Sequence, residues 1–143
     1  MRLADSEAEW AERAGEVPIG ALVLDAYGRI LSKAHNTCIA DCDISAHAEI
    51  NALRRAGRAI GNYRLPGCYL VVTLEPCVMC AQAIVQARLA GLVFGARDSL
   101  AGAVVSRAAS LIIPNSGKDT WYMGGVLGDM CCERLRRFFA QRR

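Results

Sequence analysis

The feature that most constrains this chain is a pair of cysteines three residues apart behind a proline, within residues 73–80 (TLEPCVMC). A helix that begins at Pro76 would place the thiols of Cys77 and Cys80 on one face, because residues i and i+3 are neighbours on a helix surface. Proline suits the first helical position, since its missing N–H removes no bond there. Thiolates bind metals, and the positive end of a helix dipole favours the thiolate. We therefore expect a metal site that is completed by ligands from elsewhere in the chain.

A third ligand lies upstream, in residues 45–49 (SAHAE). Histidine and cysteine together point to zinc, so His47 joins Cys77 and Cys80 as a candidate metal ligand. Structural zinc sites are closed by four protein ligands, whereas catalytic sites keep one position for water. The other histidine, His35, lies outside any metal-ligand spacing, and the remaining cysteines form no second spaced pair. Three ligands therefore predict one catalytic zinc ion per chain, with water in the fourth position.

Glu49 is the candidate proton carrier of this site. A zinc ion lowers the pKa of its bound water to roughly 7, which supplies hydroxide as a nucleophile. Glu49 and His47 are two residues apart, so they do not share a helix face and Glu49 need not bind the metal. It can instead take the proton of the water and hand it to the leaving group. Two other interpretations of the cysteines are a redox pair, which expects no upstream His-x-Glu, and a structural zinc, which lacks a fourth ligand.

H-x-E followed by P-C-x-x-C is the signature of the zinc nucleobase deaminases. Further runs occur in order around it: residues 17–21 (VPIGA), Asn36, residues 62–65 (NYRL), residues 73–80 and residues 94–98 (FGARD). Together they resemble the bacterial tRNA-specific adenosine deaminases over most of residues 15–98, and again at Phe138 and Phe139. The resemblance implies zinc-dependent hydrolytic deamination of adenosine to inosine at the wobble position of a tRNA anticodon. The tRNA anticodon stem-loop would be the substrate.

The resemblance also implies substrate contacts. Asn36 would hydrogen-bond the target purine, Asp98 would face the neighbouring nucleotides, and Val17 and Pro76 would complete the substrate-binding set. From the residues alone, Asn36 is more simply a turn residue at a strand end, and the loop with Asp98 is an exposed one. After that loop the chain departs from the family, which often continues Lys-Thr-Gly where this chain has SLAG. The divergent stretch, residues 99–121, weakens the link to one particular substrate.

The C-terminal segment is rich in arginine, and we expect a final helix over residues 131–143. The formal net charge is only +3, but acids crowd the start of the chain and arginines its end, so a basic patch can exist. By resemblance this helix would bind RNA through phosphate contacts, with Arg142 and Arg143 as candidates. Phe138 and Phe139 are candidates for stacking on an unpaired base, and we expect one of them to lie in the core. A solvated helix face is the alternative.

Alternating strands and helices predict an α/β fold, a three-layer α/β/α sandwich in a single domain, residues 1–143. The resembling family has a cytidine-deaminase-like mixed sheet of about five strands. Helices are expected over residues 1–14, 47–56, 78–89 and 131–143, and strands over residues 19–24, 29–35, 67–72 and 91–94. The two helices that carry the zinc ligands should lie side by side on one face of the sheet.

Composition bears on location and partners. No stretch reaches the roughly 20 apolar residues of a membrane span, and the acidic start lacks the regions of a signal peptide, so we expect a cytoplasmic protein. Seven cysteines fit metal binding plus free thiols rather than a disulfide framework. The resemblance implies a homodimer. Two rivals remain: a deaminase of a free base such as guanine or cytosine, and a non-catalytic RNA-binding subunit, against which Glu49 counts.

Overall fold

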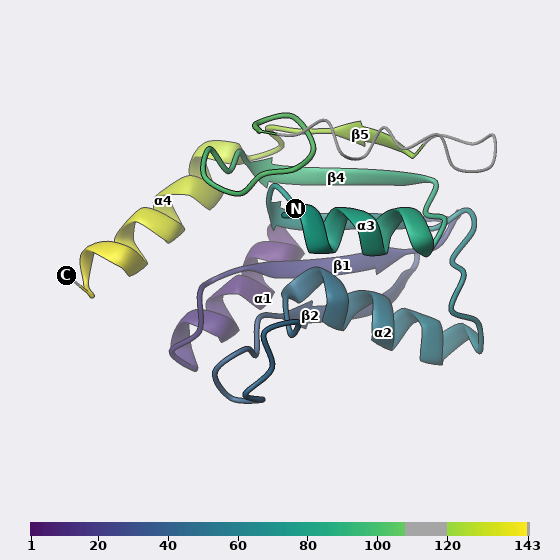
Figure 1. The fold of residues 1–143 in the computed structure, drawn as a ribbon, viewed down its shortest axis with the longest axis horizontal. Coiled ribbons are helices and arrows are strands. Elements are labelled where there is room, and N and C mark those ends of the chain that lie inside the picture. Colours follow the sequence, from purple (N-terminus) through teal and green to yellow (C-terminus); the bar gives the residue numbers. More distant parts are fainter. Residues whose placement is uncertain (108–119, 143) are drawn as a thin grey trace.

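The computed structural model describes residues 1–107 and 120–142, and it contains one five-stranded sheet with helices on both faces (Figure 1). The helices are α1 (Arg2–Arg13), α2 (Ala48–Ile60), α3 (Val78–Gln86) and α4 (Gly128–Ala140). The strands are β1 (Gly20–Leu24), β2 (Ile30–His35), β3 (Tyr69–Leu74), β4 (Gly91–Ala96) and β5 (Trp121–Met123). The predicted three-layer α/β/α sandwich is confirmed.

The sheet is mixed and has the order β2-β1-β3-β4-β5. Strand β1 runs antiparallel to β2 and β3, while β4 and β5 run parallel to β3. The start of β1 therefore lies at the same end of the sheet as the carboxyl ends of β2, β3 and β4. Helices α2 and α3 follow β2 and β3, so both begin at this end. In sheets of this kind ligands bind beyond the carboxyl ends of the parallel strands.

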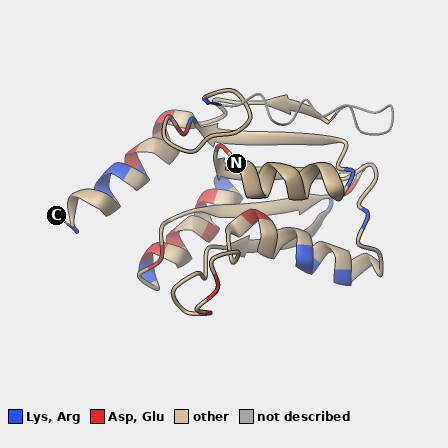
Figure 2. Cartoon of the chain, in the orientation of Figure 1, with Lys and Arg blue, Asp and Glu red and all other residues tan. Residues whose placement is uncertain are grey.

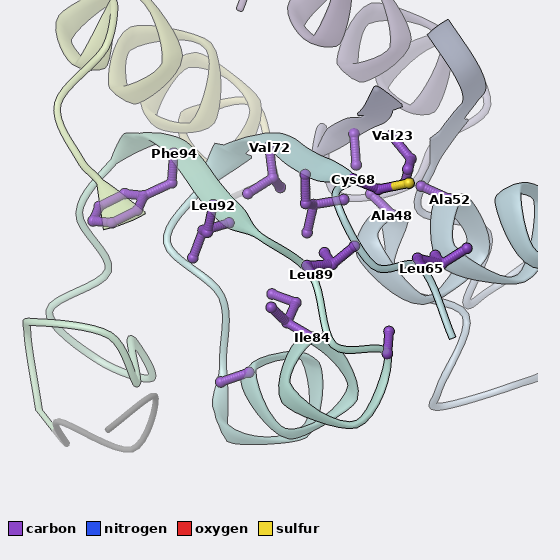
Figure 3. Close-up of a cluster of buried hydrophobic side chains, with 14 of the residues drawn as sticks. Val23, Ala48, Ala52, Leu65, Cys68, Val72, Ile84, Leu89, Leu92 and Phe94 are labelled. Atoms are coloured by element: carbon purple, nitrogen blue, oxygen red, sulfur yellow. The ribbon is translucent and has the colours of Figure 1, made fainter. Parts of the chain in front are cut away.

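The two faces of the sheet are packed differently. On the face toward α2 and α3, the strands contribute branched and aromatic residues, and these pack against alanines and Ile84 of the two helices (Figure 3). Toward α1 the sheet presents Leu22 and Val71, which pack against Ala4. Helix α1 lies very close to β1, because a Cβ added at Gly20 would be 2.0 Å from the carbonyl oxygen of Ala4. The alanine stripe of α1 thus covers the second face of the sheet.

Helix α2 is longer than predicted. It runs through Gly57 to Ile60 and ends at Gly61, which takes the left-handed conformation at φ 69°. The predicted helix ends at residue 56, directly before Gly57, but Gly57 keeps helical geometry in a crowded place. A Cβ on Gly57 would lie 3.2 Å from the carbonyl oxygen of Asn62. Gly57 therefore allows the backbone at Asn62 to pack closely against the helix, and Gly61 ends the helix.

Four other helix boundaries differ from the prediction. Helix α3 begins at Val78 with Cys77 as its N-cap, so Pro76 lies just before the helix rather than at its first position. It ends at Gln86 instead of residue 89. Helix α4 begins at Gly128, three residues before the predicted start, and ends at Ala140. Apolar periodicity marks the buried part of a helix, and the turns at its ends depend on capping contacts.

Arginines of α4 join it to acidic residues of α1, the two groups that Figure 2 colours blue and red. Arg134 donates to both carboxylate oxygens of Asp5, at 2.7 and 2.8 Å, and to Glu12 at 2.7 Å. Arg137 also donates to Glu12. The side chains of Arg134 and Asp5 are each only 16% exposed. These two arginines therefore hold the helices together, and they are less available to bind nucleic acid.

Replacing Arg134 with glutamine should lower the free energy of unfolding by about 1–3 kcal/mol, because two nearly buried carboxylates lose their partner. Burial alone would raise the pKa of Glu12, but hydrogen bonds from Arg134 and Arg137 lower it below its ordinary 4.5. A lowered folded-state pKa means that the stabilisation is complete above pH 4.5 and is lost as the pH falls through the folded-state pKa. The loss in the Arg134 variant should therefore shrink in acid, which urea unfolding at neutral and acidic pH can measure.

Arg13→Gln is the matched control, since it removes the same charge from an exposed pair with Glu9. We expect it to change the free energy of unfolding by less than about 1 kcal/mol. Equal losses in the two variants would show that the contact between α1 and α4 contributes no more than a surface ion pair.

Among the residues that the structure describes, no helix is both long and apolar enough to cross a membrane.

Candidate metal centre

His47, Cys77 and Cys80 meet where α2 and α3 begin. Their ligand atoms all lie within 4.8 Å of one another. The Nδ1 atom of His47 is 3.8 Å from the sulfur of Cys77 and 3.5 Å from that of Cys80. His47 is the N-cap of α2 and Cys77 the N-cap of α3, each with extended backbone. The fold thus brings together two helix starts that are thirty residues apart in the chain.

The geometry of this group fits a zinc ion. Zinc–sulfur bonds of about 2.3 Å and zinc–nitrogen bonds of about 2.0 Å in a tetrahedral site place sulfur and nitrogen about 3.5 Å apart. The distances of 3.5 and 3.8 Å from His47 to the two sulfurs agree with that value. One imidazole and two thiols are also a ligand set that zinc favours. Within residues 1–107 and 120–142 the group holds three ligands, which leaves the fourth tetrahedral position for a non-protein ligand.

Hydrogen bonds within the group favour the charged form of one thiol. Those from Cys80 and His47 lower the pKa of Cys77 to about 3. The pKa of His47 is raised, chiefly by its hydrogen bond to Cys77. The pKa of Cys80 is raised by the hydrogen bond that it shares with Cys77 and by burial. A metal ion replaces such shared protons, because thiolate and neutral imidazole are the forms that bind metal.

Glu49 lies in the first turn of α2 and is only 4% exposed. Burial raises the pKa of its carboxyl group to about 7, although His47 and a backbone N–H act in the opposite direction. A carboxyl group with a pKa near neutrality can both accept and release a proton under physiological conditions. The geometry therefore suits the predicted role of Glu49 as a proton carrier, which stays a prediction.

Asn36 follows β2 and is 5% exposed. Its side-chain oxygen accepts a hydrogen bond of 2.8 Å from the backbone N–H of Ala48, next to His47. The assignment of oxygen and nitrogen in the side-chain amide follows from this contact. With its oxygen engaged at the start of α2, Asn36 has its amide N–H groups to offer to an acceptor on a bound purine. The predicted contact with the target base is compatible with this placement.

A groove of about 930 Å³ lies between residues 97–101 and α4. Four of the residues predicted to contact substrate or RNA line it: Val17, Asp98, Phe139 and Arg142. Both arginines and apolar side chains line it, a combination that suits the phosphates and bases of a single strand. The fold therefore gathers, in one groove, candidates that come from three separate parts of the sequence.

The other candidates lie elsewhere. Pro76 is buried, and its carbonyl oxygen accepts a hydrogen bond from Ala103. Phe138 is 4% exposed and packs edge-to-face on Phe139, which is 49% exposed. Of the two phenylalanines, Phe139 is therefore the one that a base can reach. Arg143 and residues 108–119 of the divergent stretch lie outside the described residues.

Sequence reasoning missed two residues of this region. Arg136 lines the groove beside Phe139, and its helical spacing of three from Phe139 could have indicated this. Glu75 is 1% exposed and accepts hydrogen bonds from residues 98–106. No signal in the sequence marks Glu75 as buried, because an acid at the end of an apolar strand is normally exposed. Arg142 was predicted, but it also donates to the carbonyl oxygen of Gly15 at 2.7 Å.

Comparison with known proteins gives a consistent result. Residues 1–96 match the family described as the cytidine and deoxycytidylate deaminase zinc-binding region. The chain is 43% identical, over its whole length and 83% of the relative, to the tRNA-specific adenosine deaminase of Haemophilus influenzae. Its fold is similar to a structure from studies of A-to-I editing by tRNA A34 deaminases at the wobble position of transfer RNA. The TM-score is 0.88 and the identity 40%, over 94% of this chain and 97% of the other.

A second group of structures is less similar. The guanine deaminase of Nitrosomonas europaea is 25% identical, with a TM-score of 0.79, over 96% of this chain and 81% of that protein. Both the identity and the TM-score are lower than those of the comparison with the tRNA deaminase. Of these two structures, the one from the tRNA deaminase studies is the more similar to this chain.

Proposed function

The chain belongs to the cytidine and deoxycytidylate deaminase family, and from this premise we propose that it deaminates adenosine to inosine at the wobble position of a tRNA anticodon. One observation carries the proposal: the cluster of His47, Cys77 and Cys80 lies beside buried Glu49, at the end of the sheet where an arginine-lined groove opens. The reaction is a hydrolysis, in which water replaces the amino group on C6 and ammonia leaves.

His47, Cys77 and Cys80 would hold one zinc ion per chain. When bound, zinc lowers the pKa of a water molecule and so supplies the nucleophile. Glu49 accepts the proton of that water and then delivers it to the departing amine. Its carboxyl group is buried next to the ligand cluster, where it can reach both the water and the amine. Asn36 holds the purine through its side-chain amide.

The groove would receive the nucleotides beside the target adenosine. An anticodon loop is single-stranded, so its bases can be splayed out at a lower cost than those of a duplex. Phe139 offers an exposed ring for base stacking, and Arg136 and Arg142 offer charge to the phosphates. Asp98 lies in the same groove and can accept hydrogen bonds from a base edge. Candidates from the middle and from the C-terminal end of the chain would thus act on one RNA segment.

We also propose that the protein is a cytoplasmic homodimer with a single domain. One sheet with packed helices on both faces supports the single domain. A mainly apolar groove of about 720 Å³ on the outer side of α2 and α3, which includes Leu53, Tyr63 and Ala83, supports a dimer through these helices. Transfer RNA as the substrate supports the cytoplasm. Light scattering of the purified protein would test the oligomeric state.

Deamination of a free purine is the second candidate function, and the similarity to a guanine deaminase favours it. Ammonia release from an anticodon stem-loop with adenosine at the wobble position, measured beside free bases and nucleosides, separates the two. We expect release from the RNA alone. Release from guanine but not from the RNA would overturn the assignment to tRNA. A non-catalytic RNA-binding subunit would release ammonia neither from the RNA nor from a free base. Glu49 counts against this alternative, because such a subunit needs no proton carrier.

Replacing Arg136 with glutamine should weaken binding of the stem-loop and reduce its dependence on salt. Each phosphate contact that is lost lowers the slope of log affinity against log salt concentration by roughly 0.7–0.9. Fluorescence anisotropy at several salt concentrations measures both quantities. Arg29→Gln, in the turn between β1 and β2 at the opposite end of the sheet, removes the same charge and should leave the slope unchanged. Identical slopes for the wild type and the Arg136 variant would place the RNA elsewhere.

A further inference from the structure

Glu75 makes an unusual number of hydrogen bonds for a buried carboxylate outside the metal centre. One oxygen accepts backbone N–H groups from Val104, Val105 and Ser106, at 3.1, 2.7 and 2.9 Å. The other accepts the N–H of Asp98 at 3.1 Å and the hydroxyl of Ser106. The residue itself is 1% exposed. Every side-chain hydrogen bond of Glu75 within the described part of the chain is therefore with one segment, residues 98–106.

That segment also packs directly on the metal motif. Ala103 donates to the carbonyl oxygen of Pro76 at 2.9 Å, and Gly102 forms an isolated β-bridge with Cys77. A Cβ added at Gly102 would lie 2.5 Å from the carboxyl carbon of Glu75 and 2.5 Å from the carbonyl oxygen of Asp98. Only a glycine lets the segment approach so closely. Residues 98–106 are thus fixed to the residues that precede and include a zinc ligand.

The same segment forms a wall of the groove. Asp98 uses one carboxylate oxygen to accept the N–H groups of Leu100 and Ala101, at 2.9 and 3.0 Å. This turn sets the shape of residues 98–101, which line the groove opposite α4. The backbone of Asp98 is in turn held by Glu75. A chain of hydrogen bonds therefore leads from Glu75, two residues before Cys77, to the surface that would meet the substrate.

We propose that Glu75 is a positioning residue for RNA: it fixes residues 98–106 so that the groove wall has the correct place and shape beside the zinc centre. The inference rests on the proposed function, because it assigns the groove to nucleotides that flank the target adenosine. Glu75 does not touch the reacting atoms. Its loss should therefore affect the binding of RNA far more than the chemical step, which a purely structural role would not predict.

Glu75→Gln is the sharpest variant. Three N–H groups face one oxygen, so the amide oxygen must occupy that position and the amide nitrogen the other. At that position the hydroxyl of Ser106 can rotate and accept a hydrogen bond from the new amide nitrogen. The backbone N–H of Asp98 cannot, and it loses its acceptor. Ser106→Ala is the matched control, because it removes one bond to the same oxygen and leaves the contact with Asp98 intact.

The test is steady-state deamination of the stem-loop, with zinc content and amide hydrogen exchange measured on the same samples. For Glu75→Gln we expect KM to rise about 10-fold and kcat to change less than about 3-fold, because one charge-assisted bond is lost away from the reacting atoms. Exchange at Asp98 should accelerate, and zinc content should stay at the wild-type value. Ser106→Ala should keep KM within about 2-fold.

Gly102→Ala gives the same test if Glu75→Gln fails to fold, because its Cβ displaces the segment while the carboxylate remains. An unchanged KM and unchanged exchange at Asp98 would overturn the proposal, and so would a fall in kcat together with loss of zinc. Failure of the proposed function looks different, since the wild type would then not deaminate the RNA at all. Hydrogen exchange at Asp98 would in that case still decide whether Glu75 holds the segment.

Discussion

Replacing Glu49 with alanine is expected to reduce kcat for deamination by about 10³-fold, because the proton of the attacking water loses its acceptor and the amine its donor. Zinc content and stem-loop affinity should remain at the wild-type level, since Glu49 is neither one of the three clustered ligands nor part of the groove. Single-turnover kinetics with saturating enzyme measures the chemical step. Metal analysis measures the zinc content, and fluorescence anisotropy measures the affinity for the stem-loop.

Glu49→Gln is the matched variant, because it keeps the size and most hydrogen-bonding capacity of the side chain but cannot carry a proton at neutral pH. It should be as inactive as the alanine variant. The two differ in packing, so equal losses would attribute the effect to the missing carboxyl group rather than to a cavity. Turnover within about 10-fold of the wild type in either variant would move the role of proton carrier to another residue.

Replacing Cys80 with alanine is expected to remove the zinc and, with it, all measurable deamination. Cys80 is fully buried, and its sulfur is one of three ligand atoms that gather within 4.8 Å. A site with two remaining ligands binds metal far more weakly, and metal binding also stabilises the folded state. The zinc content should fall from one per chain to nearly zero, and the melting temperature should fall with it.

Cys68→Ala is the control for loss of a buried thiol. Cys68 is 5% exposed and precedes β3, at the end of the sheet opposite the metal centre. It should keep its zinc and its kcat, although a small cavity lowers its stability. If the Cys80 variant retained zinc and activity like this control, the proposed ligand set would be wrong. Removal of metal from the wild type with a chelator should abolish activity reversibly.

The zinc cluster could be predicted from the sequence because its information is local. The spacing of Cys77 and Cys80 fixes two ligands at one helix start, and the spacing of His47 and Glu49 separates a ligand from a carboxylate. The alternation of strands and helices then limits how the two motifs can meet. For the same reason the first four strands and the packing of α2 beside α3 followed from apolar runs and their order along the chain, whereas β5 was not among the predicted strands.

Other features depend on contacts between distant residues, which no local pattern records. Arg134 lies in the arginine-rich C-terminal segment, which was expected to bind RNA, but it pairs with Asp5, 129 positions away. Phe138 and Phe139 are adjacent and chemically identical, and only the packing of α4 decides which of them is buried. In the sequence Glu75 resembles an exposed acid at a strand end, but residues 98–106 cover it in the fold.

The most direct test of the account is to map inosine in a full-length, unmodified tRNA that carries adenosine at the wobble position, after incubation with the zinc-loaded protein. We expect inosine at that position and at no other adenosine of the tRNA, and none after incubation with the Glu49→Gln variant. Inosine spread over several loops would contradict the specificity that the groove is proposed to provide. A tRNA that stays unchanged, together with deamination of free guanine by the same sample, would contradict the assignment to tRNA itself.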